Sequence, residues 1–139
     1  MPTVQKSLRV PEEINKKIEE LARISGKDFT TVANELLEEA IKAHQCPGIV
    51  FTEGTSGKRA RMGGSGIEVW EVIAAYKSVG EDFKRLSKSY HWLTEQQLKS
   101  AIGYYILYRK EIDAIIAENE RFTPDTVRKK YPFLIAGKR

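Results

Sequence analysis

A short alternating stretch near the N-terminus, residues 4–10, places the strongest constraint on the fold. It reads Val-Gln-Lys-Ser-Leu-Arg-Val, the pattern of one β-strand, and two helical patterns follow it directly. No second strand pattern lies within hairpin distance. A lone strand leaves backbone N–H and C=O groups unpaired, which disfavours burial and promotes association. We expect a second copy of the chain to supply the missing strand, and the resulting two-stranded ribbon fits the DNA major groove.

The side chains of this stretch divide into two faces, because successive residues of a strand point to opposite sides. One face holds Leu8 and Val10 with the aliphatic stem of Lys6. The other face carries three polar residues: Gln5, Ser7 and Arg9. Arginine suits guanine, glutamine suits adenine and serine suits either base. The same residue types also occur on ordinary solvent-facing strands, so the DNA-reading interpretation depends on the two helical patterns after the strand.

Two amphipathic helices are predicted after the strand. Pro11 suits the first turn of a helix, Gly26 a helix end, and Asp28 the N-cap of the second helix. The apolar positions are Ile14, Ile18, Leu21 and Ala22 in the first helix, and Val32, Ala33, Leu36, Leu37, Ala40 and Ile41 in the second. A unit of roughly 45 residues cannot cover such a face alone. Dimerisation covers this face and pairs the strand at the same time.

The order strand, helix, glycine-containing turn, helix resembles the ribbon-helix-helix proteins of the Arc, MetJ and CopG kind. The resemblance is carried by Gln5–Glu13, Ser25–Asp28 and Leu36–Ile41. It implies an obligate dimer whose ribbon reads the major groove through the polar face of the strand.

The resemblance also implies where phosphates are held. It places an anchor at residues 28–31, where the free N–H groups and dipole of the second helix favour an anion. Phe29 and Thr30 lie there, and Asp28 is expected to act as the cap. Residues 1–45 carry 7 Lys+Arg against 8 Asp+Glu, so binding relies on a local basic patch made by Lys6, Arg9 and Lys27. This favours specific binding of moderate affinity over strong non-specific binding.

The totals of the chain indicate a cytoplasmic protein without a membrane segment. The single cysteine excludes an internal disulfide framework and is typical of a reducing compartment. No apolar run is long enough to span a bilayer, and the N-terminus lacks the signal-peptide pattern. Residues 46–120 are balanced, with 10 Lys+Arg and 10 Asp+Glu, whereas residues 121–139 carry 6 against 1. The net charge of +4 therefore belongs to the C-terminal tail.

Residues 44–48 break the second helix and predict a domain boundary. Residues 49–51 and 58–62 are predicted to form a hairpin, and residues 63–66 a turn. Helices are expected around Val69–Tyr76, at Phe83–Leu86, and from a capping box at Thr94–Gln97 through to Ala117, with a bend near Tyr108. We expect the tryptophans and most tyrosines of these helices to belong to the core.

Residues 46–117 resemble a small domain family found in VapB-like antitoxins and antitoxin-linked regulators. The resemblance is carried by Pro47–Phe51, Val69–Ile73, Leu93–Ala101, Tyr104–Tyr105 and Glu111–Asp113. It implies a helix-turn-helix-like core made by residues 83–89, the turn at His91 and Trp92, and the helix from Thr94. Three residues are then candidates for a second DNA or partner surface: Gln96, Gln97 and Lys99. The balanced charge of this domain favours the alternative of a packing or partner-binding role.

The tail combines cations with apolar anchors, which suits a groove with an acidic site on a partner protein. The candidate toxin-binding residues are Arg128, Lys129, Lys130, Tyr131, Phe133, Leu134 and Ile135. Packing back on residues 46–120 and a frayed terminus are the alternatives.

No constellation for catalysis, metal binding or a cofactor is found. His44 and His91 lie in unrelated contexts, and Cys46 has no evident base partner. We therefore expect a protein that is not an enzyme.

The sequence predicts a mainly α-helical chain with three parts. These are a ribbon-helix-helix domain (1–45), a small helical domain with a β-hairpin and a helix-turn-helix-like core (46–120), and the basic, aromatic tail (121–139). The expected function is that of a DNA-binding antitoxin in a type II toxin–antitoxin pair. It represses its own operon and neutralises a toxin, expected to be a nuclease. Its partners are operator DNA, the toxin, and a second copy in a homodimer or larger oligomer. A stand-alone repressor is the alternative.

Overall fold

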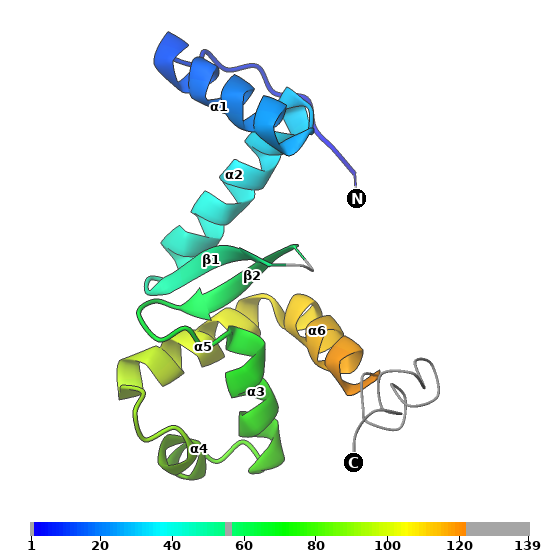
Figure 1. Cartoon of the computed structure of the whole chain (residues 1–139). Coiled ribbons are helices and arrows are strands. Elements are labelled where there is room, and N and C mark those ends of the chain that lie inside the picture. Colours follow the sequence, from blue (N-terminus) through cyan, green and yellow to red (C-terminus); the bar gives the residue numbers. More distant parts are fainter. Residues whose placement is uncertain (1, 55–56, 122–139) are drawn as a thin grey trace, which may run out of the picture. The chain divides into compact units, whose positions relative to one another are not determined.

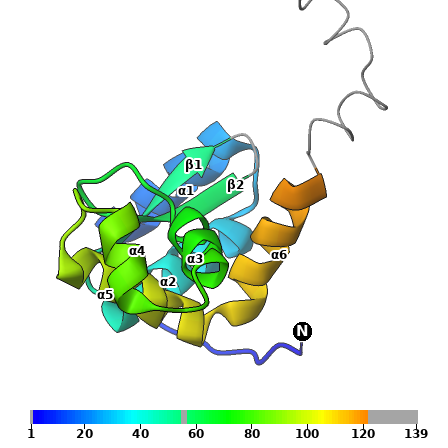
Figure 2. The ribbon, with the colours of Figure 1, turned by 90° about the horizontal axis from the view of Figure 1, so that it is seen from below.

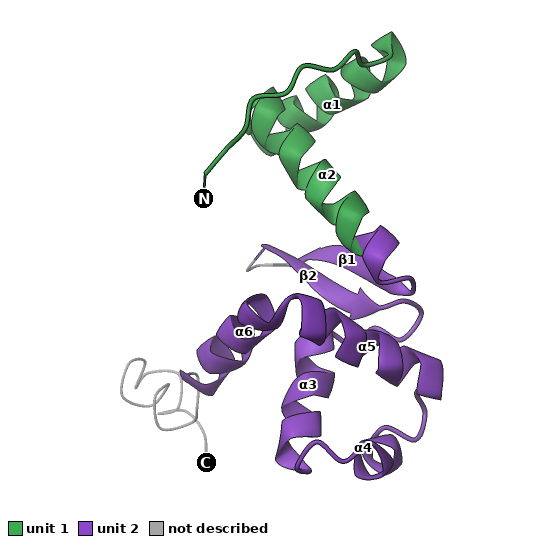
Figure 3. Cartoon of the chain, turned by 180° about the vertical axis from the view of Figure 1, so that it is seen from behind, with its two compact units in different colours: residues 1–42 green, residues 43–139 purple. Residues whose placement is uncertain are grey.

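The computed structural model of the chain describes residues 2–54 and 57–121. In that part the chain is mainly helical, as predicted, with six α-helices and one two-stranded antiparallel sheet (Figure 1). It divides into two compact units, Met1–Lys42 (unit 1) and Ala43–Arg139 (unit 2), which Figure 3 distinguishes by colour. The predicted boundary between residues 45 and 46 lies close to this division. The ribbon across two chains and the helix-turn-helix-like core stay predictions.

Unit 1 contains an N-terminal segment, α1 (Glu12–Ser25) and most of α2 (Phe29–Gln45). The helix α1 ends at Gly26, whose φ of 71° is a left-handed conformation that glycine adopts without steric penalty. The helix α2 is capped by Asp28, whose Oδ1 accepts a hydrogen bond of 2.7 Å from the backbone N–H of Thr31. Both features were predicted. No residue of α1 is buried, and Val32 is the only buried residue of α2.

The predicted hairpin follows the last residues of α2 in unit 2. The strands β1 (Ile49–Gly54) and β2 (Gly57–Met62) pair antiparallel, with Ile49 opposite Met62 and Phe51 opposite Ala60. These four residues share one face of the hairpin, since side chains alternate along a strand. Ile49, Ala60 and Met62 are buried, so this face contributes to the core of unit 2.

Four helices come after the hairpin, over the stretches that were predicted. They are α3 (Val69–Ser78), α4 (Phe83–Ser89), α5 (Glu95–Leu107) and α6 (Arg109–Arg121). Their inward side chains and the hairpin form one hydrophobic core. Figures 1 and 2 show the ribbons of these helices beside the hairpin. The largest fully buried side chains are Met62, Val69, Val72, Ile73, Leu86, Leu98, Tyr104 and Ile112. The predicted bend occurs at Tyr108, whose φ of −123° and ψ of 46° separate α5 from α6.

The aromatic side chains of unit 2 mostly agree with the prediction of a core role. Tyr104 and Tyr105 are buried, and Trp70 and Tyr76 pack against the core. Trp92 is the exception, because 59% of its surface remains exposed. It lies in the turn between α4 and α5, next to the buried Leu93.

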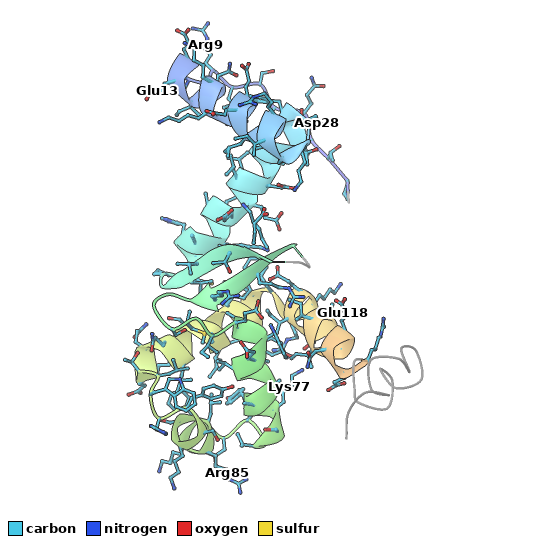
Figure 4. The ribbon with its side chains drawn as sticks, viewed as in Figure 1. Arg9, Glu13, Asp28, Lys77, Arg85 and Glu118 are labelled. Atoms are coloured by element: carbon cyan, nitrogen blue, oxygen red, sulfur yellow. The ribbon has the colours of Figure 1, made fainter. Side chains whose placement is uncertain are left out.

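A polar network ties α6 to α3 and α5. The hydroxyl of Tyr104 donates a hydrogen bond of 2.6 Å to Glu111, and burial together with this bond raises the pKa of Tyr104. The carboxylate of Asp113 accepts hydrogen bonds of 2.8 Å from Lys77 of α3 and from the hydroxyl of Tyr105. Figure 4 shows Lys77 on the side of α3 that faces α6. The bond from Lys77, and then that from Tyr105, lowers the pKa of Asp113.

Candidate nucleic-acid interface

The segment of residues 4–10 presents its predicted DNA-reading side chains to solvent. Gln5, Ser7 and Arg9 are all exposed. In the single chain the segment is neither helical nor paired as a strand, and it runs back beside α1 (Figures 1 and 3). A strand is defined by hydrogen bonds to a neighbouring strand, so the single chain does not test the ribbon. Its apolar residues Val4 and Leu8 are also exposed.

Most cations of unit 1 are paired with a carboxylate of the same unit. The ion pairs are Lys16–Glu12, Lys17–Glu13, Arg23–Glu20, Lys27–Glu35 and Lys42–Glu38. Lys6 and Arg9 form no ion pair with a residue in the ranges 2–54 and 57–121. Figure 4 shows Arg9 at the N-terminal end of α1. The positive charge that unit 1 can offer to a phosphate therefore lies on the segment of residues 4–10.

The structure changes the expectation for Lys27, which was assigned to the basic patch. Its Nζ donates to both carboxylate oxygens of Glu35, at 2.9 and 3.1 Å. A phosphate has to compete with this carboxylate for the ammonium group. Of the three cations expected in the patch, Lys27 is the one with a carboxylate partner among the described residues.

The predicted phosphate anchor at the start of α2 is partly occupied by the chain itself. Asp28 accepts the backbone N–H of Thr31, and this bond lowers the pKa of the Asp28 carboxyl. One of the free N–H groups at the helix start is thus satisfied, and a negative charge is held beside it. Phe29 and Thr30 are exposed. The anchor is left with fewer N–H groups for a phosphate than an uncapped helix has.

The three candidates on α5 differ in their side-chain partners. The side chain of Gln97 completes the predicted capping box, because its Oε1 accepts the backbone N–H of Thr94 at 2.9 Å. Its Nε2 donates to the carbonyl of Gly63 at 3.3 Å, so both ends of the amide serve the fold. Lys99 pairs with Glu95 at 2.9 Å, and Gln96 is exposed. Of these three candidates, Gln96 is the one whose side chain has no hydrogen bond or ion pair to a described residue.

The candidate toxin-binding residues of the tail, Arg128 to Ile135, lie outside the described residues. Their assignment stays a prediction.

Sequence reasoning missed a group of cations on α4. Lys84, Arg85 and Lys88 are exposed, whereas Leu86 of the same helix is fully buried. The spacing of the three cations around the apolar Phe83 and Leu86 was a signal available in the sequence.

No family model, curated protein or solved structure matches this chain. Among residues 2–54 and 57–121, no helix has both the length and the apolar composition needed to cross a bilayer.

Proposed function

We propose that the chain is a homodimeric, sequence-specific DNA-binding protein of the ribbon-helix-helix kind. It acts as the antitoxin of a type II toxin–antitoxin pair and represses its own operon. The DNA-binding part rests on unit 1, and the antitoxin part rests on residues 46–139.

The observation that carries the proposal is the exposure of the apolar side chains of unit 1. Eight large apolar residues of this short unit are between 37% and 79% exposed: Val4, Leu8, Ile14, Leu21, Ile24, Phe29, Leu37 and Ile41. Soluble monomers rarely leave so much apolar surface uncovered in one small region. Single helices without packing partners are also marginal in water. A second copy of unit 1 covers these side chains and supplies a neighbour for residues 4–10.

The polar side chains of the same segment support DNA as the ligand. Two antiparallel copies of residues 4–10 present Gln5, Ser7 and Arg9 twice on one face of the ribbon. Lys6 and Arg9 add four cations for each dimer, none of them paired with a described carboxylate of its own chain. Base-reading groups and phosphate-binding charge thus come from one short segment.

The antitoxin role is supported by the resemblance of residues 46–117 to the domain found in VapB-like antitoxins. The cations and apolar residues of the tail support a toxin with an acidic groove as the partner. Because operator DNA and an intracellular toxin are the proposed partners, the proposed location of the protein is the cytoplasm.

The DNA-binding part is tested with the full chain and the DNA upstream of its own reading frame. Loss of a bidentate arginine–guanine contact costs about 1–3 kcal/mol, so Arg9→Ala should weaken binding by about tenfold or more. Arg23→Ala removes an equal charge from α1, where Arg23 is paired with Glu20, and is the matched control. Sedimentation of each variant establishes that the dimer persists. Equal operator affinity for Arg9→Ala and the wild type removes the ribbon from the proposal.

The antitoxin part is tested by co-expression with the protein of the adjacent reading frame. Deletion of residues 121–139 should abolish capture of that protein and rescue of growth, while operator binding is retained. If capture and rescue survive the deletion, the tail is not the toxin-binding segment. If the adjacent protein is neither toxic nor captured by the full chain, the stand-alone repressor is the better description.

A further inference from the structure

The helix α4 presents a basic face that the rest of unit 2 leaves open. Lys84, Arg85 and Lys88 occupy positions i, i+1 and i+4, which places them on one side of the helix. All three are exposed, and Leu86 anchors the opposite side in the core. Figure 4 shows Arg85 directed away from the body of unit 2. We define these three residues as the α4 basic face.

The charges of the α4 basic face are not compensated within the part of the chain that the structure describes. No ion pair joins any of its three cations to a described carboxylate, whereas Arg61, Lys77 and Lys99 of unit 2 each pair with an acid. The nearest acids in the sequence are Glu81 and Asp82. The Oδ1 atom of Asp82 accepts the backbone N–H groups of Lys84 and Arg85, at 3.0 and 3.3 Å, so it caps the helix.

The three cations lie on a helix whose position is held by two local contacts. The Asp82 cap holds the start of α4, and the fully buried Leu86 holds its middle. Less conformational entropy is therefore lost on binding than if the three cations were on a loop. Along the helix axis, Lys84 and Lys88 are separated by about 6 Å. Double-stranded DNA carries a charge about every 1.7 Å along its axis, so this face can meet more than one phosphate.

We infer that the α4 basic face binds the phosphate backbone of double-stranded DNA. This contact is a second one, additional to the ribbon, and it rests on the proposed DNA-binding function. It replaces α5 as the nucleic-acid surface of unit 2, because Gln97 is engaged in the capping box and Lys99 is paired with Glu95. The contact is with phosphates and positions unit 2 on the duplex without reading its sequence.

The test measures the salt dependence of DNA binding by the full chain. The α4 variant Lys84→Gln/Arg85→Gln/Lys88→Gln is compared with Lys58→Gln/Lys110→Gln/Arg121→Gln, which removes the same charge from other exposed parts of unit 2. The probe is a labelled duplex of arbitrary sequence, and circular dichroism verifies that both variants are folded. Loss of three phosphate contacts in each chain, six in each dimer, lowers the slope of log Kobs against log salt by about 5.4. From about 50 to about 200 mM salt, the wild type should then lose about 2000-fold more affinity than the α4 variant.

The control variant should keep the slope of the wild type. If the α4 variant and the control have the same slope, the inference is wrong. Arg9→Ala, measured in parallel, separates this result from the ribbon: loss of operator affinity only in Arg9→Ala supports the ribbon and overturns the α4 contact. Loss of slope in the α4 variant, together with unchanged operator affinity in Arg9→Ala, supports the α4 contact and overturns the ribbon. If the α4 variant binds DNA like the wild type but loses binding to poly-L-glutamate, the face serves an acidic protein and the inference is also wrong.

Discussion

The exposure of Leu37 leads to a quantitative prediction for the dimer. Complete burial of a leucine side chain stabilises by about 1.5–3 kcal/mol. Leu37 is 55% exposed in the single chain. Burying this exposed part in a dimer therefore contributes about 0.8–1.7 kcal/mol for each chain. An alanine keeps only a small part of this contribution. Leu37→Ala should therefore cost about 2 kcal/mol for each dimer, which raises the dimer dissociation constant by about 30-fold.

Sedimentation equilibrium of the full chain over a range of concentrations measures this constant. Lys16→Ala, on the polar side of α1 and already paired with Glu12, is the control and should leave the constant unchanged. A monomeric wild type throughout the accessible concentration range refutes the reasoning. So does an equal dissociation constant for Leu37→Ala and the wild type, because the exposed side of α2 is then not the dimer surface.

Two further predictions concern unit 2. Thr94→Ala removes the capping-box hydrogen bond from the backbone N–H of Gln97 to the Thr94 hydroxyl. This should cost about 1 kcal/mol of stability and lower the midpoint of thermal unfolding by about 4–8 °C. Thr94→Ser keeps the hydroxyl and should retain most of the stability. The pKa of Asp113 is lowered by Lys77 and Tyr105, so its contribution is present at neutral pH and is lost as the pH falls below about 4. Because this pair is partly exposed, the loss should be below about 1 kcal/mol, and urea unfolding should show a smaller acid-induced loss for Asp113→Asn.

Local signals explain why much of the fold could be predicted. The cap at Asp28, the end of α1 at Gly26 and the capping box at Thr94 are decided by a few neighbouring residues, and the structure has each of them. The hairpin was predictable because its two short strands are joined by a glycine-containing turn and lie close in sequence.

Long-range contacts explain what was missed at the candidate site. Lys27 is eight residues from Glu35, across the turn between α1 and α2, and no periodicity rule predicts that pair. The bond from Gln97 reaches Gly63, which is 34 residues away. The capping-box pattern in the sequence could have predicted that the Gln97 amide is bonded to the backbone of Thr94. A side chain that caps a helix in this way is not free to read a base. Contacts within the chain therefore give Lys27 and Gln97 partners with which DNA would have to compete.

The distribution of paired and unpaired cations is more informative than net charge for a chain of this kind. Residues 1–45 have no excess of positive charge, yet five of the seven cations of unit 1 are neutralised locally, and the other two lie on the segment that carries the base-reading groups. The same comparison in unit 2 separates α4 from α5, although both helices carry exposed polar residues. A phosphate gains most from a cation that has no carboxylate to give up. We therefore expect DNA phosphates to contact Lys6 and Arg9 in unit 1 and, as a separate contact, the α4 basic face in unit 2.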